Sequence, residues 1–264
     1  MTRGTGNIMR VVLVVIALIA TIGCGGGSGE AAAGRRSTGA VPLTSWDNKP
    51  DFTGVWEGTP LSAEAYGLSE LARLYQPPAK EKMKALTEND DPTNACITYG
   101  SPRHQAMGFP LQIIQSVGSL AVLSDRPHIF RFIQIDGRQH QEDIFPTNLG
   151  DQVGRWEADS LVVDITSYNG RMWLAGARDH ELPDGAGGFI TSEALHVVER
   201  WRLLDADTLE YQATVEDPDV LTRPWTTPKM TYTRSAARQV GEGICIPAAI
   251  DYEAPALRKA DARP

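Results

Sequence analysis

Three side chains that could hold an anion or move a proton surround a predicted hairpin turn at Asp136-Gly137. Asp-Gly between two alternating apolar runs is among the strongest short-range hairpin signals. With this turn, Arg131 opposes Glu142 and His140 lies on the same face. The arginine could hold an anionic group, and the histidine, which titrates near neutral pH, could transfer a proton. The structural alternative is a solvated cross-strand Arg–Glu pair of little energetic weight.

A second candidate base is His196, in the predicted strand 192–203. Neither face of this strand is cleanly apolar, which suits a barrel whose interior is partly polar. If the protein is an enzyme, His196 or His140 could act as a general base, with Glu193, Glu142 or Asp164 as a carboxylate partner. A hydrogen-bonded structural histidine is the alternative.

Four further positions complete the set of candidate site residues. Asp164 lies in the apolar strand 161–166. Burial of a carboxylate without a partner is costly, so we expect it to be paired or to face a pocket. Arg103 could be that partner or could anchor an anionic ligand. Trp173, on a predicted loop, could stack against a ring or cap the barrel, and His128 lies on the opposite face of the predicted hairpin.

Several kinds of chemistry have no signature in this chain. The sequence contains no Gly-x-Ser-x-Gly elbow, no Walker-type phosphate loop and no dinucleotide fingerprint. It has no His-Glu-x-x-His, and its histidines are scattered without metal-ligand spacing. We therefore expect no cofactor and no dedicated metal site.

The elements that must position these residues are mainly strands. Apolar residues recur with helical spacing over 61–75, with Ser62 as a cap and Pro77-Pro78 as a stop, and a short charged helix is expected over 79–86. Gly54 and Gly154 each open a strand. Other strands are predicted at 111–115, 120–123, 129–135, 161–166, 194–203, 209–215 and 229–233. Short turns without intervening helices favour one mainly β, antiparallel, barrel-like domain over 51–253, preceded by one or two short helices.

The N-terminal segment has the features of an export signal. Arg3 and Arg10 precede an apolar run at 11–22, which is short for a membrane span, and Gly23-Cys24 follows. The pattern resembles a bacterial lipoprotein signal, which implies that 1–23 is removed and Cys24 is acylated. An ordinary secretory signal or an uncleaved anchor is the alternative. Gly25 after the cysteine implies sorting to the periplasmic side of the outer membrane, and 24–50 reads as a flexible tether.

The net charge limits the kinds of partner that the protein can bind, and the cysteines indicate a compartment. The net charge is −8, or −10 once Arg3 and Arg10 are removed with the signal. An acidic chain gains nothing from counterion release, so we expect no nucleic-acid partner and membrane attachment only through the acyl chain. If Cys24 is acylated, Cys96 and Cys245 remain as a disulfide pair for an oxidising compartment, or as two separate thiols. The polar tail 254–264 is predicted to be disordered.

Several motifs together resemble those of a broad family of exported bacterial proteins. They are Pro50-Asp51-Phe52-Thr53-Gly54-Val55-Trp56, Gly154-Arg155-Trp156-Glu157, Leu161-Val162-Val163-Asp164 and the run from Ser192 to Arg200. The Gly-x-Trp at the first strand is also similar to the entry of lipocalin-like barrels. The resemblance implies export and a barrel, and brings no particular activity.

These observations predict a lipid-anchored protein that binds a small, partly apolar molecule in a β-barrel pocket. The alternative from another class is a cofactor-free lyase, isomerase or hydrolase that uses a histidine, a carboxylate and an arginine in the same pocket. A structural envelope protein is the third possibility. Convergence of His140, His196, Arg103 and Arg131 on one cavity would favour the enzyme.

Overall fold

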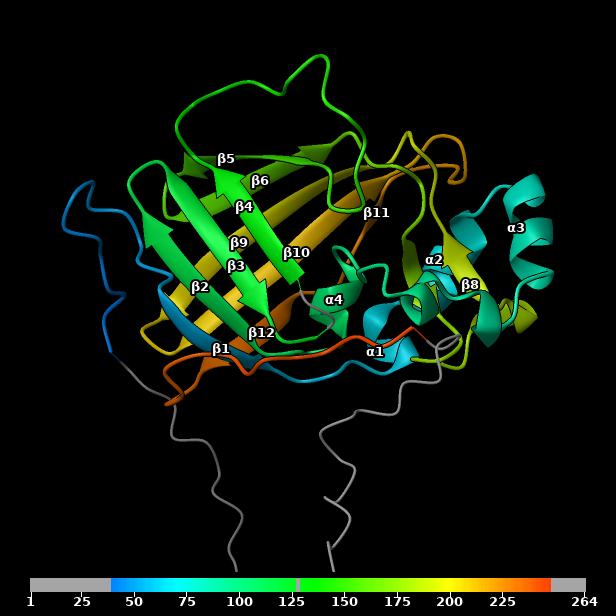
Figure 1. The fold of residues 1–264 in the computed structure, drawn as a ribbon, viewed down its shortest axis with the longest axis horizontal. Helices are drawn as coiled ribbons and strands as arrows, with labels where there is room; N and C mark the ends of the chain where they lie inside the picture. The colour runs from blue at the N-terminus through cyan, green and yellow to red at the C-terminus, as the bar shows by residue number, and fades with distance from the viewer. Residues whose placement is uncertain (1–38, 127–128, 248–264) are drawn as a thin grey trace, which may run out of the picture. The chain divides into compact units, whose positions relative to one another are not determined.

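A series of short strands closes into a nine-stranded β-barrel (Figure 1). The structure is a computed structural model that describes residues 39–126 and 129–247. The strands are β1 (Gly54–Gly58), β2 (Leu111–Ser116), β3 (Ser119–Ser124), β4 (Ile129–Gln134), β5 (Asp151–Glu157), β6 (Ser160–Thr166), β7 (Trp173–Gly176), β8 (Gly188–Ile190), β9 (His196–Asp205), β10 (Thr208–Glu216), β11 (Trp225–Thr226) and β12 (Met230–Arg234). The predicted mainly β, barrel-like fold is confirmed.

The barrel closes between β9 and β10, and its order is β10-β12-β1-β2-β3-β4-β5-β6-β9. Neighbouring strands are antiparallel except β4 and β5, which meet in parallel at Gln134 and Val153. A parallel neighbour cannot be reached by a two-residue turn, so the chain crosses over through the loop 138–150. The predicted hairpin is therefore wrong: the chain turns at Asp136-Gly137, but Glu142 does not pair with Arg131, whose strand has β3 and β5 as neighbours.

Short helices and the β7–β8 hairpin gather at one end of the barrel (Figure 1). Ser62 caps the first helix as expected, but Gly67, at φ +81°, splits the predicted helix in two. Pro77 begins the next helix instead of ending the previous one, because the first turn does not need its missing N–H. The helices are α1 (Ala63–Tyr66), α2 (Leu68–Leu74), α3 (Pro77–Lys84) and α4 (Arg103–Ala106), with single 3₁₀ turns at Glu88–Asp90, Pro92–Ala95 and Pro183–Gly185.

Large side chains fill the barrel interior. Trp56 on β1 is fully buried, donates from its indole nitrogen to the Phe52 carbonyl, and lies under the guanidinium of Arg234. Trp201 on β9 packs edge-on against Tyr211 on β10, with ring centroids 4.7 Å apart. Inward residues alternate with outward ones along β9 and β10, which is the alternation that made these strands predictable.

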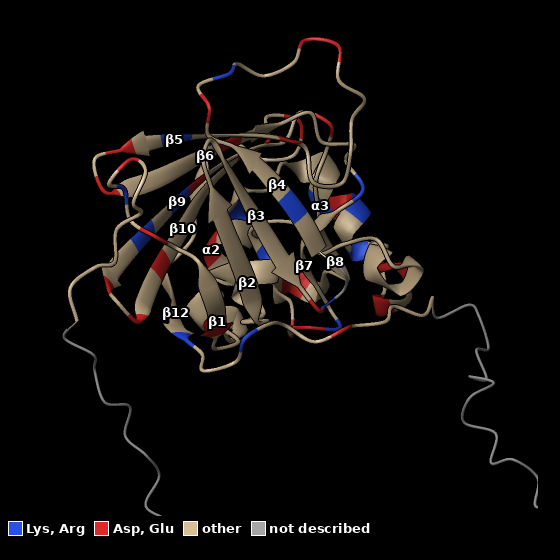
Figure 2. Ribbon diagram, turned by 60° about the vertical axis from the view of Figure 1, so that its left-hand side comes forward, with Lys and Arg blue, Asp and Glu red and all other residues tan. Residues whose placement is uncertain are grey.

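The outer surface of the barrel differs sharply from one side to the other. β2 and β3 contain no charged residue, and β4 contains only Arg131, which is buried (Figure 2). None of the outward side chains of these strands is charged. They are Gln112, Ile114, Ser116, Ser119, Ala121, Leu123, Phe130, Phe132 and Gln134. The outward faces of β5, β6, β9 and β10 carry ion pairs, such as those of Arg200 with Glu157 and Arg202 with Asp159. Titratable chemistry on the barrel wall is therefore concentrated on this second side.

Ordered structure begins before Pro50, the predicted end of the tether. Leu43 forms a β-bridge with Pro50, and Thr44 is buried. The predicted signal 1–23, Cys24, most of the tether and the tail 254–264 lie outside the described residues. Among the residues that are described, no helix is long and apolar enough to cross a membrane.

The predicted disulfide is present. Cys96, which follows the 3₁₀ turn Pro92–Ala95, is bonded to Cys245 in the segment after β12, with the two Cα atoms 5.8 Å apart. The bond fixes that segment, over 149 residues of sequence separation, against the helical end of the molecule.

Candidate functional site

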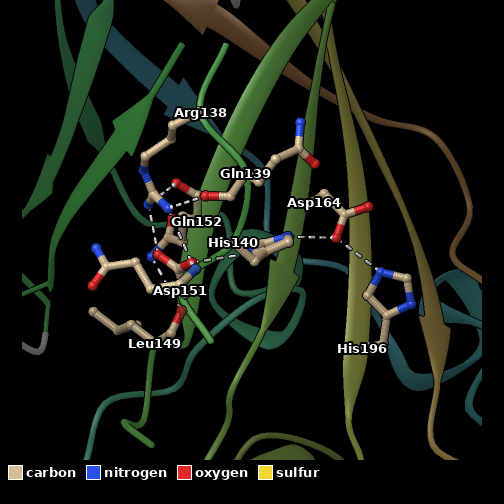
Figure 3. A network of polar contacts seen from close by, with 9 residues as sticks. Arg138, Gln139, His140, Leu149, Asp151, Gln152, Asp164 and His196 are labelled. Carbon is tan, nitrogen blue, oxygen red and sulfur yellow. Dashed lines mark hydrogen bonds and ion pairs between the residues drawn. The ribbon is translucent and has the colours of Figure 1, made fainter. Parts of the chain in front are cut away.

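His140, Asp164 and His196 meet on the outer wall of the barrel (Figure 3). Nε2 of His140 and Nε2 of His196 each lie 3.0 Å from the same oxygen, Oδ1 of Asp164. The three side chains are each about one third exposed, at 30%, 29% and 33%. We call these three residues the bridged histidine pair.

Strand register explains two of the three positions. Asp164 on β6 lies opposite Val198 on β9, so His196, two residues from Val198, faces outward beside Asp164. Such diagonal neighbours lie within reach of long side chains. His140 has a different origin, since it comes from the crossover loop 138–150 and lies over the outer face of β5 and β6.

Asp151 and Arg138 hold His140 in place. Asp151 is the first residue of β5, and its Oδ2 lies 2.9 Å from Nδ1 of His140. Arg138 donates to both oxygens of this carboxylate, at 3.1 and 2.6 Å, and the backbone N–H of Gln141 donates to it as well. The hydrogen bonds from Arg138, followed by that from His140, lower the pKa of Asp151 to about 2 although burial opposes ionisation.

Carboxylates engage both ring nitrogens of His140. Ionised carboxylate oxygens only accept hydrogen bonds, so a ring nitrogen that faces one must donate. Nδ1 of His140 faces Asp151 and Nε2 faces Asp164, so each ring nitrogen already has a carboxylate partner. His196 donates to Asp164 through Nε2, while its Nδ1 lies 3.7 Å from Glu216, beyond hydrogen-bond distance. Oδ1 of Asp164 therefore joins the two imidazoles in one chain of hydrogen bonds.

A surface pocket of about 310 Å³ adjoins the bridged histidine pair. His140 and Asp164 lie on one wall, Arg138 and Arg155 add guanidinium groups, and Val153 adds an apolar surface. Side chains that can donate protons and hydrogen bonds therefore border a space large enough for a small molecule.

Arg131 is inside the barrel, on the other side of this wall. It is 2% exposed, and it donates to both carboxylate oxygens of Glu199, at 3.0 and 2.7 Å. Its remaining donors meet Gln152 and Ser101, and Glu199 also accepts from Trp201 and Tyr211. Burial disfavours the ionised Glu199, but the charge and hydrogen bonds of Arg131 outweigh it and lower its pKa. The pair is closed to a ligand and acts as a structural centre.

The other candidates lie apart from the bridged histidine pair. Arg103 is fully buried between Asp91 and Asp179, to both of which it donates. Trp173 lies in β7, not in a loop, and is buried against Gly188. Glu142 and Glu193 are exposed and make no contact with His140 or His196 in the part of the chain that the structure describes. His128 and Cys24 fall outside it.

The sequence therefore pointed to His140, Asp164 and His196 separately but missed the residues that position them. Asp151 went unrecognised because the strand was predicted to begin at Gly154, three residues after its true start. No alternation of polar and apolar residues marks this start, because polar Asp151 shares one face with apolar Val153, and Gln152 shares the other with Gly154.

No known protein family and no curated protein matches the chain. Within residues 39–126 and 129–247, no cluster of three or more His, Cys, Asp or Glu side chains is arranged to hold a metal ion. The bridged histidine pair and its pocket are therefore the features of the molecule that point to a function.

Proposed function

We propose that this protein binds a small, partly apolar molecule in the outer-wall pocket beside His140. The observation that carries the proposal is the convergence of His140 and Asp164 on a pocket of about 310 Å³. Binding inside the barrel is less well supported, because Trp56, Trp201 and Arg131 fill the interior and are at most 2% exposed.

The lining of the pocket suggests the chemistry of its ligand. Arg138 and Arg155 border the pocket with guanidinium donors, so the ligand carries an acceptor, such as a carbonyl or carboxylate group. Arg138 is already paired with Asp151, and Arg155 with Glu157, so the pocket is not strongly cationic. Val153 and Gly154 offer a surface for an apolar portion of the ligand.

Ligand-observed NMR with a library of small carbonyl and carboxylate compounds tests the proposal. We expect saturation-transfer signals from at least one compound with the wild-type protein, and their loss in His140→Ala and Asp164→Asn. Arg202→Gln is the matched control, because Arg202 makes an exposed ion pair with Asp159 on the same wall outside the pocket. Signals that survive His140→Ala, or a library without any binder, would contradict the proposal.

Acid–base catalysis in the same pocket is the second candidate. It is favoured by the carboxylate of Asp164, which lines the pocket, is held by both imidazoles, and could take a proton from a bound ligand. The pairing of Arg103 and Arg131 elsewhere means that neither supplies the expected anion clamp. A bound ligand with an acidic C–H bond should exchange it for deuterium in D₂O faster with wild type than with Asp164→Asn. Equal exchange rates for wild type and Asp164→Asn would contradict catalysis by Asp164 and would leave ligand binding as the proposed function.

We also propose that the protein is exported and held at the periplasmic side of the outer membrane by acylated Cys24. The apolar run 11–22 before Gly23-Cys24 supports export, and the Cys96–Cys245 bond fits an oxidising compartment. In cells fed labelled palmitate, wild type should take up label and fractionate with membranes, whereas Cys24→Ala should do neither. An unlabelled wild-type protein would argue against the anchor.

A further inference from the structure

A second pocket, separate from the bridged histidine pair, lies where the disulfide joins the last segment to the helical end. It has a volume of about 450 Å³, and its walls come from distant parts of the chain. Tyr99 and Phe109 form an aromatic wall, with ring centroids 5.4 Å apart and planes at 65°. Arg126 and Arg178 border the same space.

These two arginines differ from most others in the protein. Eight described arginines, 103, 131, 138, 155, 200, 202, 223 and 234, form ion pairs with carboxylates. Arg126 and Arg178 form none within the described residues, and the side chain of Arg178 meets only the amide oxygen of Asn94. Both are exposed, so their donors are free for a ligand.

The charges around the pocket favour a ligand with a single negative charge. Asp125 also lines the pocket, so two guanidinium groups and one carboxylate leave about one positive charge. Behind the Tyr99 ring, Arg103 is 4.6 Å from the ring centroid, but Asp91 and Asp179 already bind it. A monoanion matches this balance better than a phosphate dianion would.

The wall of the pocket that comes from the segment after β12 is held in place by the disulfide. Cys245 and Ile246 line the pocket, and Cys245 is bonded to Cys96. Gly243 packs so closely on the Asp125 carbonyl that a Cβ atom would come within 1.5 Å of the oxygen. The pocket is therefore preformed in the oxidised protein, which lowers the entropic cost of binding.

From these contacts we infer that the pocket formed by Tyr99, Phe109, Arg126 and Arg178 is a binding site for a small aromatic monoanion. The arginines hold the anionic group by charge-assisted hydrogen bonds, and the ring of the ligand packs on the aromatic wall. This inference stands apart from the proposed function, since the two pockets share no residue.

Benzoate is the probe, titrated into the purified oxidised protein by NMR. Benzyl alcohol offers a similar ring without the charge, and acetate offers the charge without the ring. We expect benzoate to saturate at millimolar concentrations and to shift the Nε–Hε signals of Arg126 and Arg178. The two comparison compounds should bind at least about tenfold more weakly, because each lacks one of the two interactions.

Substitution separates this site from non-specific attraction. Arg126→Gln combined with Arg178→Gln should weaken benzoate binding about tenfold or more. Arg171→Gln should leave it unchanged, since Arg171 is another exposed arginine without an ion pair among the described residues and lies outside the pocket. Cys96→Ser with Cys245→Ser should also weaken binding, by releasing one wall.

Three results would overturn the inference. They are the absence of saturation by benzoate, equal affinities for benzoate and benzyl alcohol, and equal effects of the Arg126/Arg178 and Arg171 substitutions. The wild-type chemical shifts need no variant, so they decide the question even if a variant is unstable.

Discussion

The two sides of one barrel wall carry two polar networks of opposite character. On β5, Gln152 points inward to Arg131, while the preceding residue, Asp151, points outward to His140. The inner network joins Arg131 to Glu199, and the outer one joins His140 to Asp164 and His196. Adjacent residues of one strand thus serve a sealed network on one side and an open one on the other.

The difference lies in how completely each network is satisfied. Inside, every donor group of the Arg131 guanidinium has a partner, and both oxygens of Glu199 accept two hydrogen bonds or more. Outside, the members are about one third exposed, and Nδ1 of His196 has no close partner. A sealed network stabilises one arrangement of the core, whereas an open one can exchange protons and ligands.

The largest effect should come from breaking the inner network on one side. Arg131→Met leaves the buried Glu199 carboxylate without its counter-ion, so we expect a loss of about 3–5 kcal/mol in the free energy of unfolding, measured with urea. Arg131→Met combined with Glu199→Gln should recover part of this loss, because no unpaired charge remains. A loss below about 1 kcal/mol would show that the wall tolerates an unpaired inner charge.

The two sides should also lose stability in different pH windows. His104, on α4 beside the inner network, is fully buried, and burial together with the charge of Arg131 lowers its pKa to about 3. The unfolded chain binds this proton near the ordinary histidine pKa of 6.5, so the contribution of His104 to stability is complete above that pH. Stability should fall by about 1.4 kcal/mol per pH unit as the pH drops from 6.5 towards 3.

His104→Gln provides the control for this window. Its unfolding free energy should vary less between pH 6 and about 4 than that of wild type, because the titrating group is gone. An unchanged slope would assign the acid sensitivity to other groups.

On the outer wall, Asp151 should respond at lower pH than His104. Because the folded pKa of Asp151, about 2, is below its unfolded value of 3.8, its contribution is complete above pH 3.8 and is lost as the pH falls through 2. Asp151→Asn should therefore cost about 1–2 kcal/mol at neutral pH, since it removes the pairing with Arg138 and His140. It should also flatten the pH dependence below about 4, measured by thermal unfolding across pH. An Asp151→Asn variant as stable as wild type at pH 7 would show that the contacts of Asp151 with Arg138 and His140 do not stabilise the fold.

How far the sequence predicts this fold depends on the length of each element. Strands such as β9 and β10 are long enough for the alternation of period two to be unmistakable. β7, β8 and β11 contain two to four residues, too few for any period, and Trp173 in β7 was therefore read as a loop residue. Local patterns predicted the barrel because most of its neighbours in space are also neighbours in sequence.

The site was harder to predict because it depends on two pairings that local patterns do not give: the parallel contact of β4 with β5, and the pairing of β6 with β9, which are far apart in sequence. The chain does bend at Asp136-Gly137, but β4 pairs with β5 and not with the residues that follow the bend. No local sequence pattern predicts this pairing. Arg131 was paired with Glu142 for that reason, whereas its partner, Glu199, lies 68 residues away along the chain. Chemistry-bearing residues can be recognised by type, but their partners follow from long-range strand order.

The smallest effect on stability should come from the bridged histidine pair itself. His196→Gln removes one exposed contact with Asp164, so the free energy of unfolding should change by no more than about 0.5 kcal/mol. His140→Gln should cost slightly more, because His140 also contacts Asp151.

A double-mutant cycle then separates the two roles of the wall. If Asp164 couples the two histidines for binding, ligand affinity should show an interaction energy of at least about 0.5 kcal/mol between His140→Gln and His196→Gln. The unfolding free energies of the same variants should add to within about 0.3 kcal/mol, since each partly exposed contact contributes little to stability. Coupling in stability without coupling in affinity would give the outer network the same structural role as the inner one, and the contrast between the two sides of the wall would fail.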